Sequence, residues 1–98
     1  MKAVLQIHYR ANGEAGTRTA RGRYAWALLQ LAISGDRGCT PITHPGPRWS
    51  SYVHRLRQGG LAIETIYEAH AGPFAGNHAR YVLRTPVVIL GGDDAEAA

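Results

Sequence analysis

The chain has 98 residues, enough for one domain with one modest core. Its hydrophobic fraction of 45% is typical of a folded globular protein and excludes an intrinsically disordered chain. No apolar run approaches the roughly 20 residues that cross a bilayer, so we expect a cytoplasmic protein without a membrane partner. The single cysteine, Cys39, cannot form an internal disulfide and is expected to be buried, with a reactive thiol as the alternative.

The charge of the chain is positive and unevenly distributed. The net charge is +4 and the pI is about 9.7. The first 90 residues contain all 11 Lys and Arg against four of the seven acids, so this part carries +7. Ten of the 11 cations are arginine, whose planar guanidinium makes bidentate contacts with phosphate and guanine. The composition favours a nucleic-acid partner, with plain solubility as the alternative.

The N-terminal segment predicts a strand followed by a turn. In "KAVLQIHYR" (2–10), apolar and polar residues alternate as they do in a half-buried strand. The next six residues, "ANGEAG" (11–16), have the composition of a turn.

A first helix is predicted over 17–34, because apolar residues recur there at three- and four-residue spacing. Thr17 or Thr19 would cap its start, and Gly35 would end it. Trp26 falls on the less apolar side and is expected to be covered by the N-terminal strand or by a partner protein. Three arginines would lie in the first turns: Arg18, Arg21 and Arg23.

The segment "GDRGCTPITHPGP" (35–47) contains three prolines and three glycines. Proline removes backbone donors and restricts the residue before it, so a regular helix of any length is excluded. We expect an ordered, partly extended connector that carries at most a single helical turn.

A second helix is predicted over 48–58, with Gly46 as its cap and Pro47 at its first position. Four residues fall within about 100° of arc and form a stripe that faces the core: Trp49, Tyr52, Val53 and Leu56. The opposite arc is polar, and no acid occurs between Asp36 and Glu64. Short, donor-rich side chains without carboxylates are what a helix needs in a DNA major groove. The alternative is a solvated surface, although such faces usually include acids.

The C-terminal part predicts a hairpin and a further strand. Residues 61–69 and 79–86 alternate as strands do, on either side of a loop over 70–78 that contains glycine and proline. Residues 87–90, "VVIL", form another short strand, and 91–98 form a flexible acidic tail.

The stretches "YVHRLRQGGLAIET" and "HARYVL" resemble the small winged-helix domains of phage and prophage proteins. In that family a helix ending Leu-Arg-x-x-Gly leads into an Ile-x-Thr strand, and the return strand reads Ala-Arg-Tyr-x-Leu. The resemblance covers about residues 19–84 and implies that 48–58 is the recognition helix, 61–84 the wing hairpin and 70–78 its tip. It also implies a helix before the recognition helix, and whether the proline-rich segment 39–47 replaces that helix is left open. The N-terminal strand and "VVIL" lie outside the pattern and could pair with each other or across a dimer axis.

These observations predict an α+β fold, a winged helix-turn-helix with extra N-terminal and C-terminal strands in a single domain over 1–90. The expected function is double-stranded DNA binding by a transcriptional regulator of a phage or mobile element. The alternative is a winged-helix module that assembles with other proteins through its edge strands. The sequence contains no catalytic motif and no zinc-ligand spacing, so we expect no enzyme, metal, cofactor or small-molecule substrate. The expected partners are double-stranded DNA and, as an open alternative, a second copy of the chain. The predicted DNA contacts are Arg48, Ser50, Ser51, His54, Arg55, Arg57, Gln58, His70, Asn77 and His78.

Overall fold

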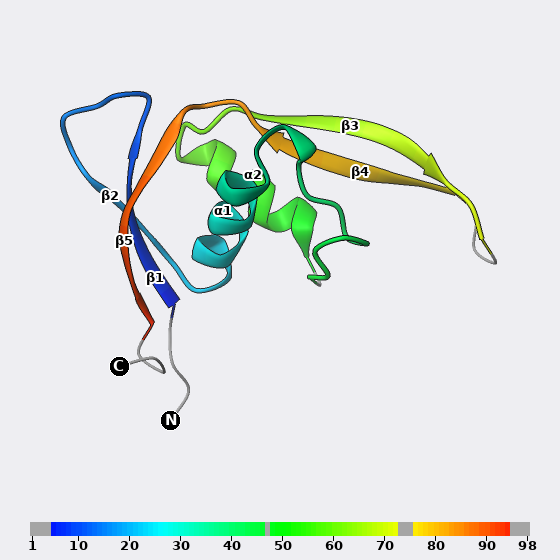
Figure 1. Ribbon diagram of the computed structural model, residues 1–98, viewed down its shortest axis with the longest axis horizontal. Helices are drawn as coiled ribbons and strands as arrows, with labels where there is room; N and C mark the ends of the chain where they lie inside the picture. The colour runs from blue at the N-terminus through cyan, green and yellow to red at the C-terminus, as the bar shows by residue number, and fades with distance from the viewer. Residues whose placement is uncertain (1–4, 47, 73–75, 95–98) are drawn as a thin grey trace.

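The computed structural model describes residues 5–46, 48–72 and 76–94. Its strands form a three-stranded antiparallel sheet of order β2-β1-β5 and a separate hairpin, β3-β4. The helices lie between this sheet and the hairpin, which extends away from them on the other side (Figure 1). In chain order the elements are β1 (Leu5–Ala11), β2 (Arg18–Arg21), α1 (Arg23–Ser34), the short 3-10 helix η1 (Gly35–Arg37), α2 (Trp49–Gln58), β3 (Ile63–His70), β4 (Gly76–Leu83) and β5 (Val87–Asp94).

The central strand of the larger sheet is β1, whose described residues cover positions 5–10 of the predicted strand; residues 2–4 of the prediction lie outside the described residues. Its alternation is as expected, since Ile7, Tyr9 and Ala11 are buried. β1 pairs with β5 of its own chain, with Tyr9 opposite Ile89, and with β2 on its other edge. Of the two arrangements left open from the sequence, the pairing of the terminal strands with each other is present.

The prediction that the first helix starts at residue 17 is wrong, because residues 18–21 form β2 and α1 begins at Arg23. Gly22, with φ of 64°, makes the sharp turn between strand and helix. Thr19 pairs with His8 and its hydroxyl lies 3.0 Å from the His8 Nδ1 atom, so it does not cap a helix. Only Arg23 of the three arginines therefore lies in the first turn. The predicted end of the helix at Gly35 is confirmed.

The core forms where α1 and α2 pack together. Leu28 and Leu31 of α1 are fully buried. The predicted stripe of α2 is confirmed, with all four of its residues buried. Trp49 packs against Trp26 at a centroid distance of 5.4 Å and stacks on Tyr81 of β4 at 6.0 Å. Trp26 is thus covered by aromatic residues of α2 rather than by the N-terminal strand.

The described part of the connector, residues 35–46, contains the helical turn η1 and, after it, a polar turn. Thr40 is buried, and its hydroxyl accepts hydrogen bonds from the backbone N–H groups of Ile42 and Thr43 at 3.1 and 3.0 Å. The His44 carbonyl accepts a bond of 2.6 Å from the Trp49 indole N–H, which fixes the entry to α2. This turn stands where the family resemblance implied another helix.

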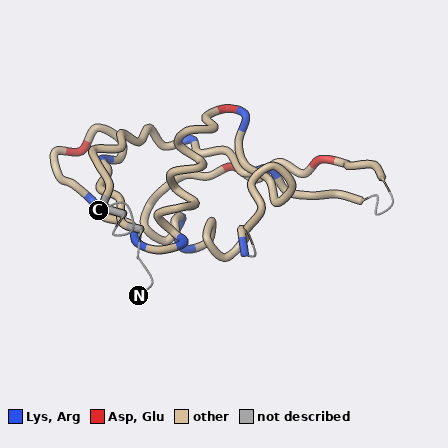
Figure 2. Tube along the Cα trace, turned by 60° about the horizontal axis from the view of Figure 1, so that its bottom comes forward, with Lys and Arg blue, Asp and Glu red and all other residues tan. Residues whose placement is uncertain are grey.

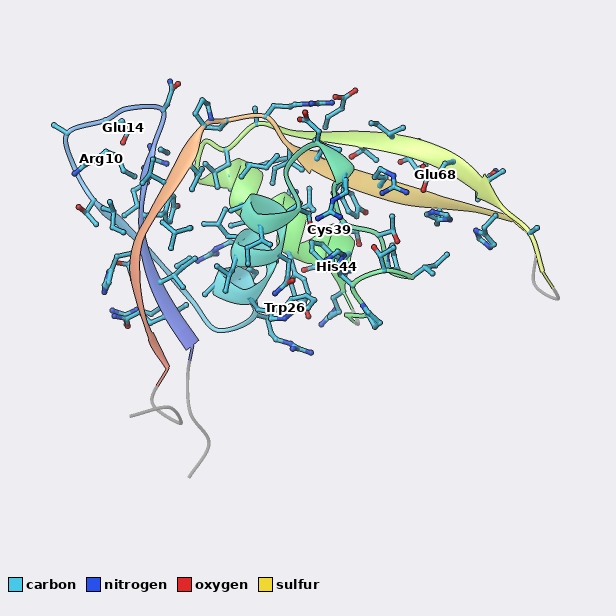
Figure 3. The ribbon with its side chains drawn as sticks, in the orientation of Figure 1. Arg10, Glu14, Trp26, Cys39, His44 and Glu68 are labelled. Carbon is cyan, nitrogen blue, oxygen red and sulfur yellow. The ribbon has the colours of Figure 1, made fainter. Side chains whose placement is uncertain are left out.

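Cys39 is fully buried, which confirms the prediction, and burial raises the pKa of its thiol. Its backbone pairs with that of Tyr81 through two hydrogen bonds of 2.9 and 2.8 Å. Cys39 and His44 lie beside the helices, whereas Glu68 lies out on the hairpin (Figure 3). The connector therefore joins the root of the hairpin to the helical part.

The C-terminal strands differ from the prediction: β3 and β4 reach further into the predicted loop, and β5 is longer. β3 and β4 run eight residues each, so the predicted loop 70–78 shortens to residues 71–75, of which 73–75 lie outside the described residues. β5 continues to Asp94, so the prediction of a flexible tail is wrong for residues 91–94, and 95–98 lie outside the described residues. Gly92 explains the extension: a Cβ there would lie 3.3 Å from the Gln6 carbonyl oxygen and from Ile7 Cγ2, so glycine allows β5 to pack closely on β1.

Candidate nucleic-acid interface

The polar face of α2 is exposed along its whole length, while the opposite face is buried in the core. Both ends of the helix are fixed by hydrogen bonds. The Trp49 side chain bonds to the connector at the start, and Arg18 Nη1 donates to the Gly59 carbonyl at 2.6 Å at the end. The first turn contains no acid, so no carboxylate opposes the approach of an anion. The exposed residues that were predicted as contacts on this helix and at its cap are Arg48, Ser50, Ser51, His54, Arg55, Arg57 and Gln58.

Two of these arginines also have partners within the chain. Arg57 donates to the Ile63 carbonyl and, at 2.8 Å, to the Thr65 hydroxyl, so it holds the first residues of β3 against the end of α2. The Arg55 guanidinium lies over the Tyr24 ring of α1, 5.6 Å from its centroid. Arg57 therefore positions the hairpin, whereas Arg55 lies on a rigid aromatic surface beside α1.

The two faces of the β3-β4 hairpin differ in their relation to α2. Thr65, Tyr67 and Asn77 share the face that meets the helix, because cross-strand pairs alternate between the faces and Arg57 binds Thr65. Tyr67 is 77% exposed on this face and was not among the predicted contacts, although the alternation of the strand could have shown it. Of the predicted wing residues, Asn77 lies on the helix side, whereas His70 and His78 point to the opposite face.

A polar network occupies that opposite face. His78 Nε2 lies 2.8 Å from Glu68 Oε1, and Arg80 donates to both carboxylate oxygens of Glu68. The Nδ1 atoms of His70 and His78 are 2.8 Å apart, and the two rings are stacked. Arg80, and after it His78, lowers the pKa of Glu68 to about 2. The network links β3 to β4, and Arg80 also donates to the Arg37 carbonyl beyond α1.

The positive charge of α2 continues toward β2 rather than along the hairpin. Figure 2 shows several Lys and Arg positions along the lower edge of the helical part, whereas positions of both signs lie at its upper side and toward the hairpin. Arg21 of β2 and Arg55 of α2 line one groove. This neighbourhood was not predicted from the sequence, because Arg18 and Arg21 were expected in the first turns of a helix.

No helix in the described part of the chain is long and apolar enough to cross a membrane. Two helices pack together, and a hairpin follows beside the exposed face of the second. This arrangement defines the winged helix-turn-helix class. A family model described as a winged helix domain matches residues 17–93. The chain belongs to this family, which confirms the predicted α+β winged-helix fold. Searches among curated proteins and among solved structures found no match to the chain.

Proposed function

We propose that the protein binds double-stranded DNA and regulates transcription for a phage or another mobile element. The observation that carries the proposal is the exposed, acid-free face of α2, on a helix whose other face and both ends are fixed in the core. A rigid helix that presents donors without carboxylates meets the requirements of the major groove. The mobile-element role is supported by the resemblance of "YVHRLRQGGLAIET" and "HARYVL" to phage and prophage domains. Because the proposed target is DNA, the proposed location is the cytoplasm. The proposed role involves no catalysis.

Within this proposal, some residues of α2 contact base edges and others contact the DNA backbone. Ser50, Ser51, His54 and Gln58 present hydrogen-bonding groups to base edges, while Arg48 contacts phosphate. Arg57 contributes charge from a side chain that also holds the hairpin. Asn77 and Tyr67 extend the same surface along the hairpin, where they reach the adjacent backbone or minor groove. His70 and His78 remain proposed contacts for a strand that wraps to the other face of the hairpin.

A Ser51→Glu variant tests this proposal. The exposed hydroxyl is replaced by a carboxylate that faces phosphates and base acceptors, and this repulsion strengthens when the contact is desolvated. We expect duplex binding in a gel shift to be abolished, with an unchanged circular dichroism spectrum. Ile33→Glu is the matched control, because it adds the same charge at a position of α1 that is 67% exposed and lies beside Asp36 and Arg37. Duplex binding by Ser51→Glu as tight as by the wild type would show that α2 is not the reading helix.

A second candidate function is assembly with other proteins through an edge strand, and the outer edge of β5 favours it. β5 pairs with β1 along one edge, no described strand covers the other, and Val88 and Leu90 are 58% and 44% exposed. Uncovered apolar edges promote pairing with another chain. A second copy paired there about a two-fold axis would bring two α2 helices together and require a palindromic DNA site. Light scattering over a concentration series decides the matter: a strictly monomeric mass throughout rules out the dimer.

A further inference from the structure

A groove lies between β2 and α2, next to the polar face of the helix. It encloses about 440 Å³. Thr19 and Arg21 line it from β2, Tyr24 from α1, and Arg55 and Gly59 from the end of α2. No acidic residue is among its lining residues.

The walls of the groove are held in place by a third arginine. Arg18 Nη1 donates to the Gly59 carbonyl at 2.6 Å, and its Nη2 pairs with the Glu14 carboxylate at 2.6 Å. The carbonyl lies at the C-terminal end of α2, where the helix dipole favours a cation. Arg18 is therefore occupied within the fold, and it fixes the distance between β2 and α2.

The two arginines that flank the groove are not neutralised in this way. Among the side chains that the structure describes (residues 6–46, 48–72 and 76–92), neither Arg21 nor Arg55 forms an ion pair with a carboxylate. The Arg55 guanidinium is oriented by the Tyr24 ring, and Arg21 is exposed at the end of β2. Arg21 and Arg55 thus line a groove without acids from two different elements, an arrangement that suits an anion with more than one phosphate.

We propose that this groove binds the sugar–phosphate backbone of the DNA duplex beside the bases that α2 contacts, an inference that rests on the proposed function. Arg55 belongs both to the polar face of α2 and to the groove, so a strand that lies along α2 continues into the groove without a gap in positive charge. The hairpin on the other flank carries Glu64 and Glu68, and both are paired with arginines of β4 or of the residue after it. The phosphate contacts thus extend toward β2. This strand is not part of α1, α2 or the β3-β4 hairpin, which together form the helix-turn-helix and its wing.

The test is a salt series with an Arg21→Ala variant and a labelled mixed-sequence duplex, read by fluorescence anisotropy. Each neutralised phosphate contributes about 0.9 to the slope of log K against log salt, which corresponds to about an eightfold change in binding constant at about 0.1 M salt. We expect Arg21→Ala to lose about this much in both quantities. Arg37→Ala is the matched control, since it removes one exposed charge on η1, away from the groove, and should change the slope much less. Arg21→Gln, which keeps a long polar side chain, should repeat the loss and separate it from any folding defect.

The outcomes separate this inference from the proposed function. If the wild type fails to bind duplex, the proposed function and the groove assignment both fall. If the wild type binds and Ser51→Glu does not, but Arg21→Ala keeps the wild-type slope, only the groove assignment is overturned. An equal loss for Arg21→Ala and Arg37→Ala overturns it as well, because the effect would then report net charge rather than a site.

Discussion

Gly38 links the helical part to the hairpin, and we predict that Gly38→Ala destabilises the protein far more than the same change at Gly35. Gly38 has φ of 68° and lies directly before Cys39, whose backbone pairs with that of Tyr81. A Cβ at Gly38 would lie 2.5 Å from the Tyr81 carbonyl oxygen and 2.9 Å from Val82 Cγ2. The oxygen belongs to the backbone of β4, so it cannot move aside as a flexible side chain would.

Gly35 provides the matched control for the size of the effect. It has φ of 55°, but no atom lies within 4 Å of its hypothetical Cβ. Both substitutions force alanine into backbone conformations reserved for glycine, at about 1–3 kcal/mol each. Only Gly38→Ala adds overpacking, which costs about another 1–3 kcal/mol. We therefore expect a loss of about 1–3 kcal/mol for Gly35→Ala and about 2–6 kcal/mol for Gly38→Ala, out of a total free energy of unfolding of about 5–15 kcal/mol.

Urea unfolding followed by tryptophan fluorescence measures both losses, because Trp26 and Trp49 pack against each other beside the core. The reasoning also predicts that duplex binding weakens in Gly38→Ala beyond the effect of unfolding, since the hairpin is joined to the connector at Cys39. Equal free-energy losses for the two variants would refute the argument, because they would show that the close approach to Tyr81 does not constrain the fold.

Two further predictions concern α2 and the hairpin. Leu56→Ala truncates a buried leucine and should cost about 2–5 kcal/mol in urea unfolding; a loss below about 0.5 kcal/mol would place that side chain in solvent. Arg80 and His78 lower the pKa of Glu68 from 4.5 to about 2, so its stabilising contribution is complete above pH 4.5 and is lost as the pH falls toward 2. Glu68→Gln should remove this part of the pH dependence in urea midpoints measured across that window, and an unchanged profile would contradict the assignment.

The helix α2 was predictable because its signals are local. The glycine pair after it and the spacing of Trp49, Tyr52, Val53 and Leu56 lie within a few residues of the element. The prediction of Gly46 as the cap is wrong, because the N-cap is Arg48 and α2 begins at Trp49. The start of α1 was not predictable in this way, because Thr17, Thr19 and the arginine between them suit either a capped helix or a strand. Their conformation is decided by pairing with β1, a contact that spacing along the chain does not reveal.

The hairpin shows how register changes a predicted site. The sequence assigned His70, Asn77 and His78 to one loop, in which all three could face a phosphate. The structure places them within paired strands, and strand alternation then separates Asn77 from the two histidines. A shift of a few residues in where the strands begin and end thus changes which face of the wing each polar residue occupies.

Arg57 shows the limit of helical periodicity as a guide to function. Its place on the helix predicted an exposed cation at the flank of the polar face, and it is exposed. Periodicity gives the direction of a side chain but not the element it meets, which here is the start of β3. The same limit applies to Arg21. The groove that Arg21 shares with α2 depends on the pairing of β2 with β1, which helical spacing does not reveal. The face that α2 exposes is therefore set by local sequence, but the surface around it is set by contacts between distant segments.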